Sequence, residues 1–118
     1  MATQTIQGKA VGSVNEMYVA KALDTLKLEY IYQYQYGLIN VRGSQVIDFL
    51  VFTVPKPTPL FVHGTYWHTG KKAQEDQLKM QELSTRMRNQ WNDPAIIWED
   101  ECENFESALN NIRGLLIV

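Results

Sequence analysis

The first regular segment of the chain has apolar residues at a spacing of three and four. Ser13 followed by Glu16 is the capping-box pattern that begins helices. We therefore expect a helix from Ser13 to about residues 26–28, with Glu16 on the same face as the apolar stripe. That stripe consists of Val19, Ala20 and Leu23.

Four later segments have the composition of β-strands. Residues 29–36 alternate aromatic and polar side chains, which predicts a strand with one packed face and one wet face. Residues 46–54 are mostly β-branched and aromatic, which is typical of a strand covered on both faces. Short apolar runs at residues 60–62 and 95–98 predict two further strands.

The remaining segments are two expected helices and a polar N-terminal segment. We expect a helix from about residue 71 to residue 90, with Asp76 on its apolar side, and an amphipathic helix over residues 104–116. The first 11 residues are polar and irregular, which predicts a loose arm or an edge strand. The order of elements predicts one α/β domain, residues 1–118, in which a small mixed central β-sheet is flanked by helices.

Composition narrows the class of protein. Of the 118 residues, 45% are hydrophobic and 20% are charged, as in ordinary globular domains. No apolar run approaches the ~20 residues that span a bilayer, and the N-terminus lacks the apolar core of a signal peptide. The single cysteine, Cys102, excludes an internal disulfide and a cysteine-rich zinc cluster. We expect a cytoplasmic protein, of bacterial or phage-type intracellular origin, without a membrane partner.

Charge is unevenly distributed along the chain. The net charge is −2, but residues 1–98 carry ten Lys and Arg against eight Asp and Glu, and residues 99–118 carry one Arg against five acids. The acidity therefore lies in the C-terminal tail. The rest of the chain is mildly basic, which permits a nucleic-acid partner without indicating one.

Asp48 interrupts a strand that is otherwise typical of a buried one. An ionised carboxylate in an apolar setting is disfavoured unless it is paired or binds a metal. This makes Asp48 a candidate metal ligand. The alternative is an Asp at the end of the strand that is solvated or bonded to the backbone.

His63 and His68 are the chain's two histidines, and both follow one strand. A turn at Gly64 would bring both imidazoles to one site, where they could act as a base or position a phosphate. The alternative is one core histidine and one surface histidine. Glu16 is equally explained as a helix cap, and Asp76 as a solvated helix acid.

A ladder of four tyrosines occupies alternate positions, at Tyr30, Tyr32, Tyr34 and Tyr36. An exposed ladder could stack nucleic-acid bases, whereas a packed one is simply core. Cys102 lies in an acidic loop without a nearby histidine, which argues against a nucleophilic role.

Several segments together resemble the very short patch repair endonucleases, which have a restriction-endonuclease-like core. Residues 16–33 (EMYVAKALDTLKLEYIYQ) resemble the family's first helix and strand and begin with its active-site glutamate. Residues 47–49 (IDF) resemble its metal-binding aspartate motif, without the usual proline before the Asp. Residues 61–68 (FVHGTYWH) match the signature F-T-H-G-C-F-W-H at six of eight positions, counting Tyr66 as Phe. Phage homing endonucleases with a Glu, Asp, His, Asp pattern have a similar core. Further similar segments are residues 76–83 and 96–99.

The resemblance implies roles for individual residues. Asp48 and the backbone carbonyl of Val62 would bind Mg²⁺ or Mn²⁺, and Glu16 would hold a metal-bound water. His63 would contact the scissile phosphate, and His68 would be the general base. These residue types suit the chemistry, because Mg²⁺ prefers oxygen ligands and imidazole accepts protons near neutral pH.

The resemblance also implies DNA as the partner. Tyr66 and Trp67 align with the aromatic pair that the repair enzymes insert between base pairs, and Lys71 and Lys72 follow them. Target choice would come from a homodimer or from a separate specificity domain.

The chain departs from the family in two respects. The family's later catalytic aspartate aligns near Ala73, so we expect Asp76, one turn further along, to replace it. The family's structural zinc is not expected here, because Cys102 and the two histidines leave no such site. The sequence therefore predicts a metal-dependent DNA endonuclease that nicks or cuts duplex, mismatched or branched DNA. The alternative is an inactive nucleic-acid-binding or assembly module on the same fold.

Overall fold

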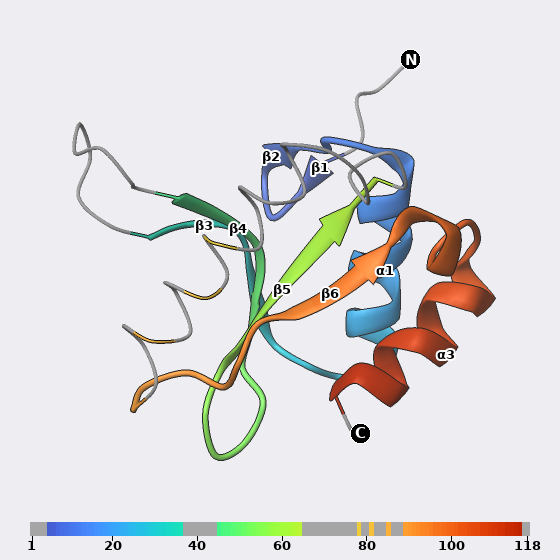
Figure 1. Cartoon of the computed structure of the whole chain (residues 1–118). Coiled ribbons are helices and arrows are strands. Elements are labelled where there is room, and N and C mark those ends of the chain that lie inside the picture. Colours follow the sequence, from blue (N-terminus) through green and yellow to red (C-terminus); the bar gives the residue numbers. More distant parts are fainter. Residues whose placement is uncertain are drawn as a thin grey trace.

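The computed structural model describes residues 5–36, 45–64 and 89–116, together with Leu78, Gln81 and Thr85. Helices lie beside a four-stranded sheet, with a small hairpin near one edge of that sheet (Figure 1). The elements are β1 (Thr5–Ile6), β2 (Lys9–Ala10), α1 (Val14–Thr25), β3 (Tyr30–Tyr36), β4 (Gln45–Val51), β5 (Thr58–His63), β6 (Ala95–Trp98), the 3-10 turn η2 (Glu99–Glu101) and α3 (Phe105–Leu116).

The sheet has the order β3-β4-β5-β6 and mixes both kinds of pairing. β3 pairs with β4 and β4 with β5 in antiparallel fashion, whereas β5 and β6 are parallel. The expected α/β class with a small mixed sheet and flanking helices is therefore confirmed. Most of the expected helix over residues 71–90 lies outside the described residues. Leu78, Gln81 and Thr85 are helical, whereas Asn89 and Gln90 form a turn, so the helix does not extend to residue 90 as expected.

Helix α1 begins where the capping pattern predicts. The Ser13 hydroxyl accepts a hydrogen bond from the backbone N–H of Glu16 at 3.2 Å, so one of the unpaired amides of the first turn is satisfied. The helix ends at Thr25, and Lys27 then adopts a left-handed conformation with a φ of 59°. The face carrying Val19, Ala20 and Leu23 is buried, as expected.

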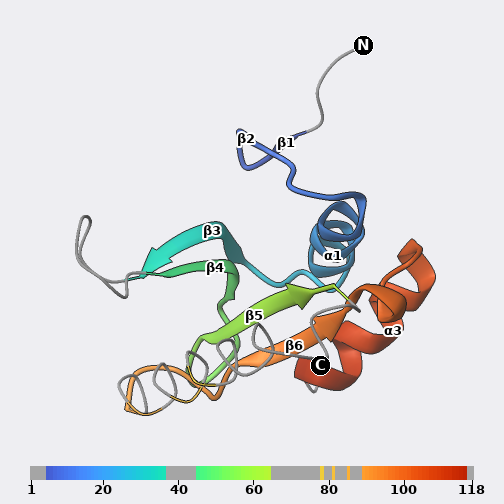
Figure 2. The ribbon, with the colours of Figure 1, turned by 45° about the horizontal axis from the view of Figure 1, so that its top comes forward.

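Apolar side chains gather on both faces of the sheet. The larger cluster lies between the sheet and the two helices (Figure 2). A smaller cluster on the other side contains Ile47, Leu50, Phe61 and Trp91. From Ile47 to Val51, β4 is thus covered on both faces, as expected, but Val46 is 55% exposed, and the strand ends at Val51 rather than at residue 54. Beyond it the chain emerges at the surface, where Val54 is 92% exposed.

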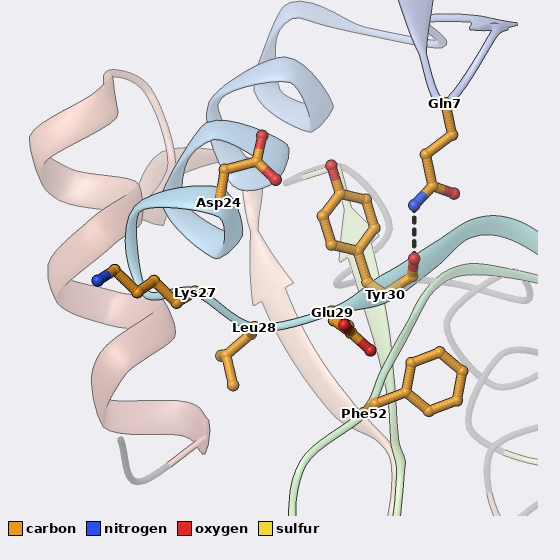
Figure 3. Close-up of a pocket in the computed structure, with 7 residues that line it drawn as sticks. All are labelled: Gln7, Asp24, Lys27, Leu28, Glu29, Tyr30 and Phe52. Atoms are coloured by element: carbon orange, nitrogen blue, oxygen red, sulfur yellow. Dashed lines mark hydrogen bonds between the residues drawn. The ribbon is translucent and has the colours of Figure 1, made fainter.

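The N-terminal segment differs from the expected loose arm or edge strand. Residues 5–10 form a two-stranded sheet of their own, and Ile6 is buried in the larger cluster. The Gln7 side-chain amide donates to the carbonyl of Tyr30 and accepts from the N–H of Tyr32 at 2.8 Å (Figure 3). Side chains, rather than a strand, therefore cover this edge of β3. The polar, irregular sequence of the first 11 residues does not reveal this arrangement.

Candidate active site between helix α1 and strands β4 and β5

Asp48 lies where the pairing of β4 with β3 is interrupted. The ladder is in register on both sides of this point, but Gln33 and Asp48 are not paired, and Gln33 has a left-handed φ of 53°. Tyr32 and Tyr34, on either side of Gln33, pack on opposite faces: Tyr32 in the larger cluster and Tyr34 against Trp91. The side chains of β3 and β4 therefore switch from one face of the sheet to the other at Asp48. This switch explains how a half-buried acid interrupts an apolar strand.

The pairing of β4 with β5 also stops beside Asp48. The last paired residues are Phe49 and Leu60. Two residues beyond Leu60, the N–H of Val62 donates to Oδ2 of Asp48 at 2.9 Å. The carboxylate thus takes a hydrogen bond that a continued ladder would give to a backbone carbonyl of β4. β4 and β5 diverge here, and a carboxylate stands in the opening.

The carbonyl of Val62 is directed to the same edge of β5. In a β-strand the N–H and C=O of one residue point toward the same neighbouring strand. Since the Val62 N–H bonds Asp48, the Val62 carbonyl belongs to the Asp48 side of β5. This is the placement that a shared ligand role of Asp48 and Val62 requires.

Glu16, in the first turn of α1, accepts hydrogen bonds at both carboxylate oxygens. The Tyr32 hydroxyl donates to Oε1 at 2.5 Å, and the Ser13 hydroxyl lies 3.2 Å from Oε2. Gly12 lies directly beside this carboxylate, and a Cβ built on it would come within 2.8 Å of Oε2. The helix cap and an inward-facing acid are therefore combined in one residue, as the sequence allowed.

Burial and the neighbouring acids disfavour the ionised forms of Asp48 and Tyr32 at this site. Burial, and to a smaller extent the nearby Glu16, raises the pKa of Asp48 to about 6, while the amide of Val62 opposes the shift. Burial and the hydrogen bond to Glu16 raise the pKa of Tyr32 to about 12, and the charge of Asp48 adds to this effect. Glu16, Asp48 and Tyr32 therefore form one electrostatic cluster between α1, β3 and β4.

His63 is the last residue of β5 and directly follows the amide that binds Asp48. Its ring makes an edge contact with Trp98 at a centroid distance of 5.3 Å and lies 6.1 Å from the ring of Phe61. Phe61 belongs to the smaller apolar cluster, whereas Val62 packs against the larger one. His63 is thus linked to the carboxylates through the backbone of Val62, and its expected contact with a phosphate stays a prediction.

The other predicted site residues lie outside the described part of the chain. Their roles as base, supporting acid and DNA contacts remain predictions. They are Tyr66, Trp67, His68, Lys71, Lys72 and Asp76.

The donor set fits a hard divalent cation. Within residues 5–36, 45–64 and 89–116, no group of three or more His, Cys, Asp or Glu side chains gathers around one point. A site there would instead use the carboxylates of Asp48 and Glu16 with the Val62 carbonyl, which are the oxygen ligands that Mg²⁺ and Mn²⁺ prefer. A cation would also relieve the unfavourable proximity of the two carboxylates, which raises the pKa of Asp48.

Three tyrosines of the ladder pack against aromatic side chains. Tyr30 and Tyr32 contact Phe49 at centroid distances of 5.5 and 5.1 Å, and Tyr34 packs on Trp91. Tyr32 is fully buried, and Tyr30 and Tyr34 are partly buried, which favours the packed interpretation for these three residues.

Other features of the described chain lie apart from the carboxylates. A pocket at the start of β3 is lined by seven residues (Figure 3), of which only Tyr30, in the tyrosine ladder, was considered for a functional role. Cys102 is fully buried, and burial raises the pKa of its thiol to about 11. The described chain contains no helix with the length and apolar character needed to cross a bilayer.

Tyr32 and Gly12 join the site without having been predicted. Tyr32 lies among four similar tyrosines, and its 16-residue separation from Glu16 follows no helical or strand spacing. Gly12 precedes a helix cap, where glycine is ordinary. Their roles depend on how β3 packs against α1, which local patterns do not encode.

Comparison with known proteins gave no relative, because the chain matches no protein-family model, no curated protein and no solved structure.

Proposed function

We propose that this protein is a Mg²⁺-dependent DNA endonuclease with a restriction-endonuclease-like core, resembling the very short patch repair endonucleases. The observation that carries the proposal is that the N–H of Val62 bonds the Asp48 carboxylate where the pairing of β4 with β5 stops, while Glu16 of α1 is near enough to raise the pKa of Asp48. These three residues come from three different elements, and the resemblance had singled out each of them from its own segment.

Each residue has a defined task in this proposal. Asp48 and the carbonyl of Val62 hold Mg²⁺ or Mn²⁺, which supplies positive charge to the phosphate as it is attacked. Glu16 orients the attacking water, and His63 contacts the scissile phosphate. His68 removes the proton from the water, with Asp76 supporting it. Tyr66, Trp67, Lys71 and Lys72 hold the DNA.

The decisive experiment is cleavage of supercoiled plasmid, mismatched duplex and a four-way junction, each with Mg²⁺ and with EDTA. We expect cleavage of at least one substrate with Mg²⁺ and none with EDTA. Asp48→Ala should abolish that cleavage without unfolding the protein, because it removes an acid that burial disfavours. Circular dichroism checks the fold.

The matched control is Asp100→Ala, which removes one acid from the exposed 3-10 turn η2 and changes the net charge equally. It should cut like the parent. An Asp48→Ala protein that also cuts like the parent would contradict the metal assignment. A parent that binds these DNAs but cuts none of them would instead identify the inactive binding module.

A further inference from the structure

We infer that Tyr32 is a positioning residue for Glu16, and that the segment Gln7–Gly12 in turn positions Tyr32. The inference rests on the proposed function, because it gives the phenol a task only if the Glu16 carboxylate acts at a metal site. Neither the tyrosine pattern nor the resemblance assigns Tyr32 such a role.

The hydrogen bonds define which way the phenol proton points. The backbone N–H of Gly12 donates to the Tyr32 hydroxyl oxygen at 3.0 Å, and the Gln33 side-chain amide lies 3.4 Å from the same oxygen. Both groups are donors, so the hydroxyl accepts from them and its single proton is left for Glu16 Oε1, 2.5 Å away.

The Ser13 hydroxyl repeats this arrangement at the other carboxylate oxygen. It accepts from the N–H of Glu16 at 3.2 Å, so its proton is directed to Oε2 of the same residue. Glu16 thus receives one donated proton at each oxygen, and such bonds to a charged acceptor are strong and directional. Its carboxylate is held in a single orientation before any cation binds.

The backbone of Tyr32 is held as firmly as its hydroxyl. Its N–H donates to the Gln7 side chain at 2.8 Å, and its carbonyl accepts from Nζ of Lys9 at 2.7 Å. The amide that holds the phenol, that of Gly12, follows directly in the same segment. The N-terminal hairpin therefore sets the position of Tyr32, and Tyr32 sets that of Glu16.

Tyr32→Phe tests the inference, with Tyr30→Phe as its matched control. Both tyrosines lie on β3 and pack on Phe49, but the Tyr32 hydroxyl bonds Glu16, whereas the Tyr30 hydroxyl lies near Asp24 at the other end of α1 (Figure 3). Mn²⁺ affinity is measured without DNA by electron paramagnetic resonance, and the Mg²⁺ dependence of cleavage under single turnover is measured separately.

We expect Tyr32→Phe to weaken Mn²⁺ binding about tenfold, the scale of one hydrogen bond to a charged group. The Mg²⁺ concentration for half-maximal cleavage should rise by the same factor. Tyr30→Phe should leave both quantities within about twofold of the parent, although it also removes a hydroxyl near a carboxylate of α1. Equal Mn²⁺ affinities in the two variants and the parent would overturn the inference while leaving the proposed function intact. A parent that neither binds Mn²⁺ nor cleaves DNA would overturn the proposed function itself.

Gly12→Ala approaches the same carboxylate from the other side. The added Cβ would lie 2.8 Å from Oε2 and 3.2 Å from Oε1 of Glu16, so the carboxylate must move. Gly12 is exposed, and its amide can still reach Tyr32, so we expect the variant to fold like the parent. We expect the same loss of Mn²⁺ affinity as in Tyr32→Phe. Unchanged affinity would show that the orientation of Glu16 does not matter to the site.

Discussion

Asp48 is a carboxylate whose surroundings oppose its charge. Burial and the neighbouring Glu16 raise its pKa, and one backbone amide from Val62 partly compensates. A carboxylate with a folded-state pKa of about 6 instead of 3.8 binds its proton more tightly in the folded protein than in the unfolded chain. Ionisation of Asp48 therefore works against folding.

This predicts how stability depends on pH at one residue. Below the unfolded pKa of 3.8, Asp48 is protonated in both states and contributes nothing; as the pH rises from there through about 6, the folded state loses stability. We expect Asp48→Asn to become more stable relative to the parent by about 2 kcal/mol between about pH 4.5 and pH 7. Urea unfolding of both proteins at the two pH values measures this.

The matched comparison uses Asp100→Asn, whose side chain is exposed in η2. Its stability difference from the parent should not change across the same range. A parent and an Asp48→Asn protein with parallel pH profiles would show that Asp48 is solvated, and would remove the reason for placing a cation beside it.

At the scale of elements, β3 has an edge that no strand of the described residues pairs. Unpaired edges present a row of backbone donors and acceptors that invite association with other chains. Here the Gln7 side-chain amide occupies two of these groups and Lys9 a third, much as a partner strand would. The hairpin of β1 and β2 thus replaces a fifth strand with two side chains.

Gln7→Ala should expose this edge. Alanine retains a Cβ at the positive φ of 52°, so the backbone strain is unchanged and the loss comes from the amide. We expect a loss of about 1–2 kcal/mol in the free energy of unfolding, because a backbone donor and an acceptor lose their partner. Urea unfolding measures the loss, and size-exclusion chromatography should show more self-association.

Gln35→Ala is the control for that experiment, because it removes the same kind of side chain from an exposed position of β3 itself. It should unfold and elute like the parent. If Gln7→Ala also behaves like the parent, water replaces the Gln7 amide at no cost and the edge needs no cover.

At the scale of the whole molecule, the larger apolar cluster joins both helices to the sheet. Cys102 lies within it, fully buried, between the η2 turn and α3, and its thiol donates to the carbonyl of Trp98 at 3.3 Å. Asn15 of α1 holds the carbonyl of Cys102 at 3.1 Å. The thiol is therefore a reporter of global opening.

Cys102 should react with Ellman's reagent about 100-fold more slowly in the folded protein than in urea, at pH 8. Burial raises the thiol pKa from 9.0 to about 11, and two pKa units reduce the reactive thiolate by about that factor. As Cys102 is the chain's single cysteine, the absorbance signal is unambiguous. Equal rates in both states would mean that the α1–α3 interface opens freely.

Local patterns account for much of the fold. The cap at Ser13, the stripe of α1, the strand over residues 30–36 and the amphipathic α3 were all predicted, because each depends on neighbours within a few residues. The end of β4 was predicted three residues too late. Apolar composition continues past Val51, but there the chain leaves the sheet.

The sequence by itself determined which residue types were available for chemistry: an acid in an apolar strand, a glutamate in a helix cap and two histidines after one strand. Tertiary structure alone decided that the charge of Glu16 acts on Asp48, that the pairing of β4 with β5 stops beside Asp48, and that Tyr32 bonds Glu16. The reason is physical. The sequence pattern records which face of a helix or strand is apolar. Whether side chains from different elements come together depends instead on sheet twist, on the positive φ of Gln33 and on packing between elements distant in the chain.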